Sequence, residues 1–299
     1  MKSKNLFNKH TYALRLTCFF ICLALILISL FSCQKTKSES NVTYEGAKVH
    51  VINVGQGDSI LIQSGIYNVL VDAGPGSHEE SLIEYLNSAG VDRLDCLVLT
   101  HPHEDHIGGA DRVIESFKID TVLMPDRVSN STAFERLLDA IEEHELLVDV
   151  PRRGDKFSLG DLNFTVLAPS DGEYDDTNNY SIVLKVEYGD TSFMLTGDAE
   201  SLSENEILRE FDRDFLKCDV LKVGHHGSET SNKEAFVRAV APTYAAVSCG
   251  LDNKYGHPHT EVRELLDSMG SEWYRTDYDG SIVFTSNGKS ITVDFEDID

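Results

Sequence analysis

The sequence predicts an α/β fold in which two mixed β-sheets pack face to face and helices cover their outer faces. Apolar, β-branched runs alternate with segments of helical periodicity along the chain. Each half begins with a group of strands and continues as alternating helices and strands, and no Pro- or Ser-rich linker separates the halves. The composition, with 41% hydrophobic and 25% charged residues, is that of a globular protein.

The first half is expected to begin with three strands and to continue with helices and strands in turn. The turn sequences Gly55-Gln56-Gly57-Asp58 and Ser64-Gly65 join the first three apolar runs. Apolar residues then recur at helical spacing until Gly90, where a helix would end. The expected strands are 49–54, 59–63, 67–71, 96–99 and 121–124, and the expected helices are 78–89, 110–117 and 132–144.

The second half repeats this pattern and closes with two strands. Its β-branched and aromatic runs predict strands at 164–167, 181–188, 192–195, 220–223, 244–247, 282–285 and 291–295. Apolar residues at helical spacing predict helices at 204–211, 233–240 and 261–269. One domain over residues 47–299 accounts for all of these elements.

Residues 1–32 have the order of a signal peptide of the lipoprotein type. A basic stretch ends at Arg15, and the uncharged apolar run 16–31 follows. This run is shorter than the roughly 20 residues that span a bilayer, which favours a signal peptide over the alternative of an uncleaved helix. Leu30-Phe31-Ser32-Cys33 is similar to a bacterial lipobox, in which Cys33 would carry the lipid. Residues 33–46 would then be a flexible tether to an extracytoplasmic, membrane-anchored domain.

The six cysteines predict no disulfide framework. Three of them lie in the N-terminal segment. The other three stand in or beside apolar strand-like runs, and we expect them to be buried and unpaired: Cys96, Cys218 and Cys249.

The net charge of the chain is strongly negative. It is −24 overall and becomes −28 after residue 32, because the four cations of the signal peptide have no acidic counterpart. Affinity for nucleic acid depends mainly on phosphate neutralisation by Lys and Arg, so this charge disfavours a protein that coats DNA. Binding of DNA would need a local basic strip, to which the candidate contributors are Arg127, Arg152, Arg153, Lys222, Lys233 and Lys254.

Histidine carries the clearest chemical signal. The first cluster follows the apolar run 96–99 and reads His101-Pro102-His103-Glu104-Asp105-His106, with Gly108-Gly109 close behind. Pro102 prevents a helix through the first two histidines, so both are expected on a loop at the strand end. Imidazoles and carboxylates on so short a loop suit Zn²⁺ or Mn²⁺, and we expect one or two ions. Two further pairs of histidines follow at 225–226 and at 257 and 259.

The string H-x-H-x-D-H at a strand end resembles the signature of the metallo-β-lactamase superfamily. Further stretches are similar to the ComEC-like group of competence proteins and its stand-alone lipoprotein relatives. They run in order and cover nearly all of the chain after residue 48: VINVGQGDSILI (51–62), VDAG (71–74), LTHPHEDHIGG (99–109), NNYSIV (178–183), LTGD (195–198), LKVGHHGS (221–228) and YGHPH (255–259). The resemblance implies the αββα sandwich of this superfamily.

The resemblance also implies a set of metal ligands. His101 and His103 would hold a first metal, and Asp105 and His106 a second. Asp198 resembles the carboxylate that bridges the two ions.

The last ligand of the second metal resembles His225, and His226 is its rival or a residue that contacts substrate phosphate. Many superfamily members have a further His for the first metal, between the first cluster and the bridging carboxylate. This chain has Asn178-Asn179 in that region, so the first site is expected to be weaker, and Asn179 is a candidate substrate contact.

Four more polar residues are candidates for supporting roles. Asp58 and Asp72 stand at strand ends that the fold would bring to one edge, and Asp72 could orient a ligand imidazole. His257 and His259 flank Pro258 before a predicted helix. His259 could donate a proton to a leaving group or bind phosphate near that helix N-terminus, while an exposed helix cap is the alternative.

These residues predict a metal-dependent hydrolase. A bound metal lowers the pKa of water, the resulting metal-bound hydroxide attacks, and Asp198 holds the hydroxide and takes its proton, with Asp105 and His259 completing the catalytic set. Resemblance to the ComEC-like group implies a phosphodiester substrate, either DNA or a smaller phosphodiester of the cell envelope. The alternatives are an enzyme like the phosphocholine esterase of teichoic acid, a non-catalytic metal-binding accessory of DNA uptake and, well behind these, a β-lactamase.

Overall fold

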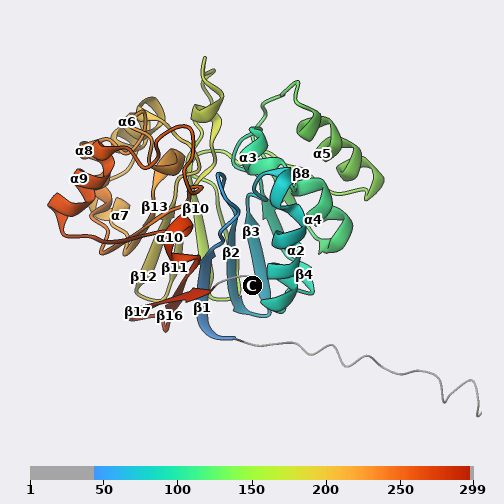
Figure 1. Cartoon of the computed structure of the whole chain (residues 1–299), viewed down its shortest axis with the longest axis horizontal. Coiled ribbons are helices and arrows are strands. Elements are labelled where there is room, and N and C mark those ends of the chain that lie inside the picture. The colour runs from blue at the N-terminus through green and yellow to red at the C-terminus, as the bar shows by residue number, and fades with distance from the viewer. Residues whose placement is uncertain (1–43, 297–299) are drawn as a thin grey trace, which may run out of the picture. The chain divides into compact units, whose positions relative to one another are not determined.

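Two mixed β-sheets stand side by side in the middle of the domain, and helices cover the outer face of each (Figure 1). The computed structural model describes residues 44–296. The expected fold class is confirmed. The predicted signal peptide, its Cys33 and residues 33–43 of the predicted tether lie outside the described residues, and the first strand begins at Tyr44, three residues before the expected start of the domain.

The first sheet has eight strands in the order β17-β16-β1-β2-β3-β5-β7-β8. Strands β17 through β3 pair antiparallel, and β3, β5, β7 and β8 pair parallel. The last two strands of the chain therefore lie beside the first. The bounds are β1 Tyr44–Val51, β2 Ile60–Gly65, β3 Tyr67–Val71, β5 Cys96–Val98, β7 Val122–Leu123, β8 Val148–Asp149, β16 Ser281–Ser286 and β17 Ile291–Glu296.

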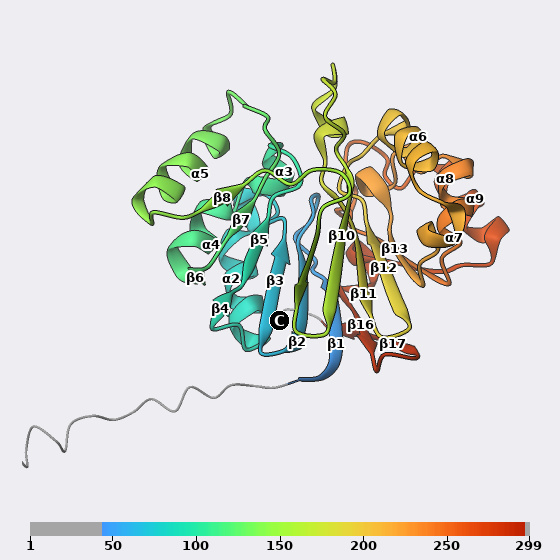
Figure 2. The same cartoon turned by 180° about the vertical axis from the view of Figure 1, so that it is seen from behind.

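The second sheet has seven strands in the order β15-β14-β13-β12-β11-β10-β9. Its first four pair parallel and its last three join antiparallel, as Figure 2 shows from behind. The bounds are β9 Lys156–Leu159, β10 Leu162–Ala168, β11 Val183–Tyr188, β12 Thr191–Leu195, β13 Val220–Lys222, β14 Tyr244–Val247 and β15 Glu272–Arg275. A separate short pair joins β4 Arg93–Leu94 to β6 Lys118–Ile119.

Helices of the first half cover the first sheet, and most helices of the second half cover the second sheet (Figures 1 and 2). The first group is η1 Gly76–His78, α2 Glu79–Ser88, α3 Glu104–Ile107, α4 Ala110–Ser116 and α5 Thr132–Glu143. The second group is η2 Thr177–Tyr180, α6 Ser201–Glu210, α7 Arg213–Leu216, η3 Gly224–Gly227, α8 Glu234–Val240, α9 Thr260–Met269 and α10 Thr276–Asp279.

Three apolar layers follow from the alternation of side chains along the strands. In β2, Ile60 and Ile62 point between the sheets, whereas Leu61 points toward the first group of helices. The layer between the sheets also contains Phe164 and Phe193 from the second sheet. The third layer lies beneath the second group of helices.

The shortest elements escaped the sequence prediction. Strands β8, β9 and β15 and helix α7 span two to four residues each, which is too short for a periodic pattern to stand out. The elements that were predicted occur within a few residues of their expected bounds, and strand 67–71 matches β3 at both ends.

Cys96, Cys218 and Cys249 are buried and unpaired, as expected. Among residues 44–296, no helix has both the length and the apolarity that crossing a bilayer requires.

The layer between the sheets predicts a strong effect of truncating its aromatic residues. Phe193 is fully buried, so Phe193→Ala should lower the free energy of unfolding by about 3–5 kcal/mol through lost burial and a residual cavity. Phe295 on β17 is 48% exposed, and Phe295→Ala should change it much less. Urea unfolding followed by circular dichroism measures both, and equal losses would contradict this description of the core.

Candidate metal centre

The predicted site residues converge where strand ends of both sheets meet. Asp72 directly follows β3, and His101 lies three residues beyond β5 in the first sheet. Asp198 lies three residues beyond β12, and η3 with its two histidines follows β13 in the second sheet. Parallel neighbours end at the same edge of a sheet, so the topology brings side chains more than 100 residues apart to one place.

His106 and Asp198 form the centre of the cluster. His106 Nε2 lies 3.3 Å from Asp198 Oδ1, and His101 Nε2 lies 3.8 Å from Asp198 Oδ2. All three residues are almost fully buried. They can offer ligand atoms within 4.8 Å of one another, as can the overlapping group of Asp105, His106 and His226.

His226, more than His225, faces this centre. His226 Nε2 lies 3.4 Å from Asp105 Oδ2 and 3.6 Å from Asp198 Oδ2, and its side chain is 2% exposed. His225 Nε2 also lies 3.6 Å from Asp198 Oδ2, but its side chain is 22% exposed and its Nδ1 faces Glu200 at 3.5 Å. His226 is therefore placed among the buried groups, and His225 at their border with solvent.

A carboxylate fixes the orientation of His106. Asp72 accepts hydrogen bonds of 2.7 Å from both the backbone N–H and the hydroxyl of Thr100, and its Oδ2 lies 2.7 Å from His106 Nδ1. Since a carboxylate only accepts, the hydrogen of His106 stays on Nδ1 and Nε2 is directed at Asp198. Asp72 thus occupies the orienting position that the sequence suggested for it.

A buried ion pair contacts His226 on the side that faces away from the cluster. Lys222 Nζ lies 2.7 Å from Asp58 Oδ2, and each side chain is 1% exposed. Asp58 Oδ1 lies 3.3 Å from His226 Nδ1, which also donates to the carbonyl of Ser248 at 3.0 Å. Because Asp58 and Ser248 both engage Nδ1 of His226, its Nε2 is directed at the cluster. Lys222 was a candidate for a basic surface strip, and this prediction is wrong because its ammonium group is enclosed by the fold.

The loop that carries His225 and His226 has an unusual backbone. Both residues adopt left-handed conformations, with φ of 49° and 55°. Such conformations are costly for residues other than glycine and need support from their surroundings. Asn232 supplies it, because its side chain accepts from Gly224 N and donates to the carbonyls of Gly224 and Ser228.

Glu204 of α6 holds this support in place. Its carboxylate accepts from the backbone N–H groups of Asn232 and Lys233. Burial raises the pKa of Glu204 to about 7, although these two hydrogen bonds act in the opposite direction.

Four predicted site residues lie around this centre. His103 is exposed, and its Nδ1 lies 3.0 Å from His101 Nε2. Asn179 accepts from Ser203 N and so serves the first turn of α6. His259 has both ring nitrogens engaged, since Nδ1 accepts from Glu229 N and Nε2 faces the carbonyl of Tyr255 at 3.1 Å. His257 is buried, and its Nδ1 has no hydrogen-bond partner.

Burial and the surrounding carboxylates act in opposite directions on the imidazoles. Burial disfavours the charged form of His226, but Asp198 and Asp58 outweigh it and raise the pKa to about 10. The pKa of His106 is also raised, by Asp198 and Asp72 against burial, while burial and neighbouring His106 lower the pKa of His101. His106 and His226 in turn hold the pKa of Asp198 well below its usual value, against the effect of burial. This excess of negative potential would equally favour a divalent cation.

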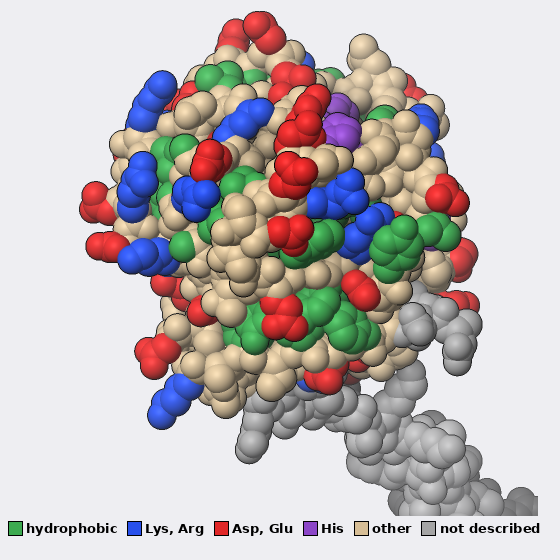
Figure 3. All heavy atoms as spheres, turned by 60° about the vertical axis from the view of Figure 1, so that its left-hand side comes forward, with side chains coloured by type: hydrophobic (Ala, Val, Ile, Leu, Met, Phe, Trp, Pro, Cys, Tyr) green, Lys and Arg blue, Asp and Glu red, His purple; other side chains and the backbone are tan. Residues whose placement is uncertain are grey.

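The donor set fits one or two metal ions. His106 Nε2, His226 Nε2 and Asp198 Oδ1 are buried without a hydrogen-bond partner, a costly state that a bound cation would relieve. Imidazole nitrogens and carboxylate oxygens are ligands for Zn²⁺, Mn²⁺ and iron alike, so the donors do not select one metal. In Figure 3 histidine side chains reach the surface at one place, with acidic side chains beside them.

Sequence reasoning missed several supporting residues. Thr100, Ser181 and Ser248 are small polar residues whose roles depend on contacts far along the chain, such as the hydrogen bond from Asp198 N to Ser181 Oγ. Asn178, rather than Asn179, reaches toward the site, since its Nδ2 donates to Glu200 Oε1 and its buried Oδ1 has no partner. The one available signal was Lys222, which lies inside the apolar run 220–223. Such a position is normally buried, so the lysine could have been expected to form a buried ion pair.

Comparisons with known proteins establish the class of this chain. The family model described as metallo-beta-lactamase superfamily matches residues 52–250, and the chain belongs to this superfamily. Among solved structures, it is similar to Igni18, described as a novel metallo hydrolase from Ignicoccus hospitalis. The TM-score is 0.51 at 14% identity, covering 80% of this chain and 99% of that one, which is a likeness of fold.

The curated relatives include competence proteins of the ComEC-like group, as the sequence motifs predicted. The chain is 34% identical to ComE operon protein 3 of Bacillus subtilis, over 88% of this chain and 35% of that protein. It is 31% identical to competence protein ComA of Neisseria gonorrhoeae, over 80% of this chain and 32% of that protein. The chain thus spans about a third of the length of these relatives.

The buried ion pair predicts a large loss of stability when its cation is removed. Lys222→Met leaves the carboxylate of Asp58 buried without its partner, and the free energy of unfolding should fall by about 3–5 kcal/mol. Adding Asp58→Asn should restore part of the loss. Lys217 forms an exposed pair with Asp214, so Lys217→Met is the matched control and should have little effect. Equal urea midpoints for the two lysine variants would refute the role of the buried pair.

Glu204 predicts a pH dependence of stability. Its pKa of about 7 in the folded state lies above the usual value of 4.5, so the folded state binds more protons and stability falls as pH rises between these two values. The contribution between pH 5 and pH 8 is about 2–3 kcal/mol. Urea unfolding at both pH values should therefore show a steeper decline for the natural protein than for Glu204→Gln. Parallel declines would show that Glu204 titrates normally.

Proposed function

We propose that this protein is a metal-dependent hydrolase that cleaves phosphodiester bonds, in DNA or in a smaller phosphodiester. The observation that carries the proposal is the buried group of His101, His106, His226 and Asp198, whose ring nitrogens and carboxylate converge without enough partners among themselves. Membership of the superfamily and the similarity to competence proteins support it.

Two overlapping ligand sets account for the geometry. His101 and Asp198 would hold one ion together with His103, which lies 3.0 Å from His101, and Asp105, His106, His226 and Asp198 would hold the other; His106 lies within reach of both sets. The first set has fewer donors, so its ion should be the weaker of the two. The geometry favours His226 over His225 as a ligand, which leaves His225 beside Asp198 at the mouth of the site.

The residues divide the chemical work. A bound divalent cation would lower the pKa of water and polarise a phosphoryl oxygen. Asp198, whose pKa is held low, is ionised at neutral pH and can accept the proton of the attacking water. His225, whose side chain is 22% exposed, lies at the border with solvent, where its Nε2 can contact the phosphate or the leaving group.

The arrangement of cations favours short or single-stranded substrates over duplex DNA. Of the candidate basic residues, Lys222 is buried, and Arg152 and Arg153 approach Asp171 and Glu206 at 3.7 and 3.8 Å. Duplex DNA would need several free cations in a row to neutralise its phosphates. A substrate whose single phosphodiester is bound at the metal centre needs no further cations, because the metal itself neutralises that phosphate.

We further propose that the domain lies outside the cytoplasm and is anchored to the membrane through a lipid on Cys33. The basic stretch, apolar run and lipobox-like sequence of residues 1–33 support this proposal. A strongly acidic domain would also be repelled by anionic lipid headgroups, so a covalent anchor would be needed to keep it there.

Metal content and hydrolysis measured together test the proposal. Protein loaded with Zn²⁺ or Mn²⁺ should cleave bis(p-nitrophenyl) phosphate, and Asp198→Asn should lower kcat/KM at least about a hundredfold, since it removes both a ligand and the proton acceptor. His226→Ala should also lower the bound metal measured by mass spectrometry, more than His225→Ala does. His144 caps α5 away from the site, and His144→Ala should retain metal and activity.

The outcomes separate the alternatives. Loaded protein that cleaves the ester no faster than Asp198→Asn is not a hydrolase, and metal binding without hydrolysis would indicate an accessory protein. Cleavage of the ester but not of single-stranded DNA at low salt would identify a smaller phosphodiester as the substrate.

A further inference from the structure

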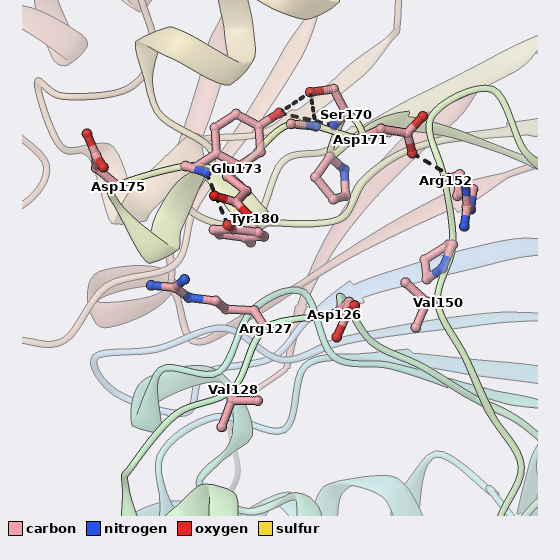
Figure 4. A pocket seen from close by; sticks show the side chains of 14 residues that line it. Asp126, Arg127, Val128, Val150, Arg152, Ser170, Asp171, Glu173, Asp175 and Tyr180 are labelled. Carbon is pink, nitrogen blue, oxygen red and sulfur yellow. Dashed lines mark hydrogen bonds and ion pairs between the residues drawn. The ribbon is translucent and has the colours of Figure 1, made fainter.

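A hollow lies at the same edge of the sheets as the metal centre. Loops that follow β7, β8 and β10 form its walls together with Tyr180 of η2, and its volume is about 1070 Å³ (Figure 4). Strands β7 and β8 run parallel to β5, which leads to His101. Ser181, next to Tyr180, has its Oγ 3.4 Å from His101 Nδ1 and accepts from Asp198 N. A substrate whose phosphate is at the metal centre can therefore extend into this hollow.

One wall is a fixed aromatic ring with a cation over its face. The guanidinium of Arg127 lies 4.8 Å from the centre of the Tyr180 ring. The hydroxyl of Tyr180 accepts from Tyr174 N, and the ring of Tyr174 stands edge-on to it at 5.1 Å. Arg127 is itself held by a hydrogen bond to Thr177 Oγ1. The flat surface is thus formed before any ligand arrives, which lowers the entropy cost of stacking on it.

The remaining walls offer hydrogen-bond acceptors. Asp126, Glu173 and Asp175 are exposed, and within residues 44–296 none of the three side chains has a hydrogen bond or ion pair. Figure 4 shows Asp126 across the hollow from the ring of Tyr180. Ionised carboxylates accept hydrogen bonds and donate none, so the hollow selects for a ligand with donors.

These features exclude two kinds of ligand and fit a third. A chain of further phosphates would be repelled by three unpaired carboxylates. A quaternary ammonium group would be repelled by the like charge of Arg127, which lies over the aromatic ring. The aromatic cages that bind such groups are lined by rings alone. A flat, neutral heterocycle with N–H donors can stack on the ring and guanidinium and donate to the carboxylates.

We propose that this hollow binds the nucleobase of the nucleotide that carries the scissile phosphodiester. The proposal rests on the proposed function and names its substrate as a single-stranded or short nucleotide ester. Guanine fits best, because N1–H and the 2-amino group are adjacent donors that match the two oxygens of Asp126. The base would stack against the surface that Tyr180 and the guanidinium of Arg127 form together, and donate to this carboxylate.

Calorimetric titration of the intact protein with deoxyguanosine 5′-monophosphate tests the hollow independently of hydrolysis. The nucleotide should bind more tightly than inorganic phosphate, and Tyr180→Ala should raise its Kd about tenfold, the usual effect of losing one stacked base. Tyr278 also lies beneath an arginine, with Arg275 4.3 Å from its ring, but it is outside the hollow. Tyr278→Ala is therefore the matched control and should leave the Kd unchanged.

Asp126→Asn supplies a second variant that cannot disturb packing, because the side chain is exposed and without a partner. It should remove the preference for deoxyguanosine over thymidine monophosphate. The nucleobase proposal is overturned by any of three results: the nucleotide binds no tighter than inorganic phosphate, Tyr180→Ala leaves the Kd of the nucleotide unchanged, or choline binds and the nucleotide does not. Hydrolysis of bis(p-nitrophenyl) phosphate is scored separately, so failure of the hollow and failure of the metal centre are distinguishable.

Discussion

One buried imidazole joins the two sheets at the edge that carries the metal centre. His106 faces Asp72, from the first sheet, through Nδ1 and Asp198, from the second, through Nε2. Ionised groups in the interior must find partners, and here each group's partner belongs to a different part of the chain. The position of the sheets relative to each other therefore sets the geometry of the site, and the apolar layer between them maintains it.

The Lys222–Asp58 pair shows that the need of buried charges for partners also determines the residues around the metal centre. The buried carboxylates Asp58, Asp72 and Asp198 face the cluster from loops at the ends of different strands, and the fully enclosed ammonium group of Lys222 offsets part of their charge. That ammonium orients Asp58, and Asp58 orients His226. The net charge of −24 thus says little about the site, because its cations and anions are paired within the fold while most of the acidic excess lies on the surface.

Much of the fold and the principal site residues could be predicted from the sequence, for identifiable reasons. The string from His101 to His106 is local, and its position at the end of an apolar strand gives both its fold context and its chemistry. The role of Lys222 depends on Asp58, 164 residues away, and no local pattern reveals such a pair. The adjacent Asn178 and Asn179 could not be told apart because only the turn of η2 decides which side chain faces α6 and which faces Glu200. The hollow lined by Tyr180 was likewise hidden, since three loops far apart in the sequence build it together with η2.

The left-handed backbone at His225 and His226 has a consequence for recognising such sites elsewhere. The two adjacent histidines can face different surroundings because an asparagine seven positions after the first clamps the loop, and a glutamate on another helix holds that asparagine. The shape is thus encoded outside the histidines themselves. A pattern search that requires only the His-His-Gly string would accept loops unable to adopt it. Requiring Asn232 and Glu204 as well would give a stricter signature, and transplanting the loop into another scaffold would need all four residues.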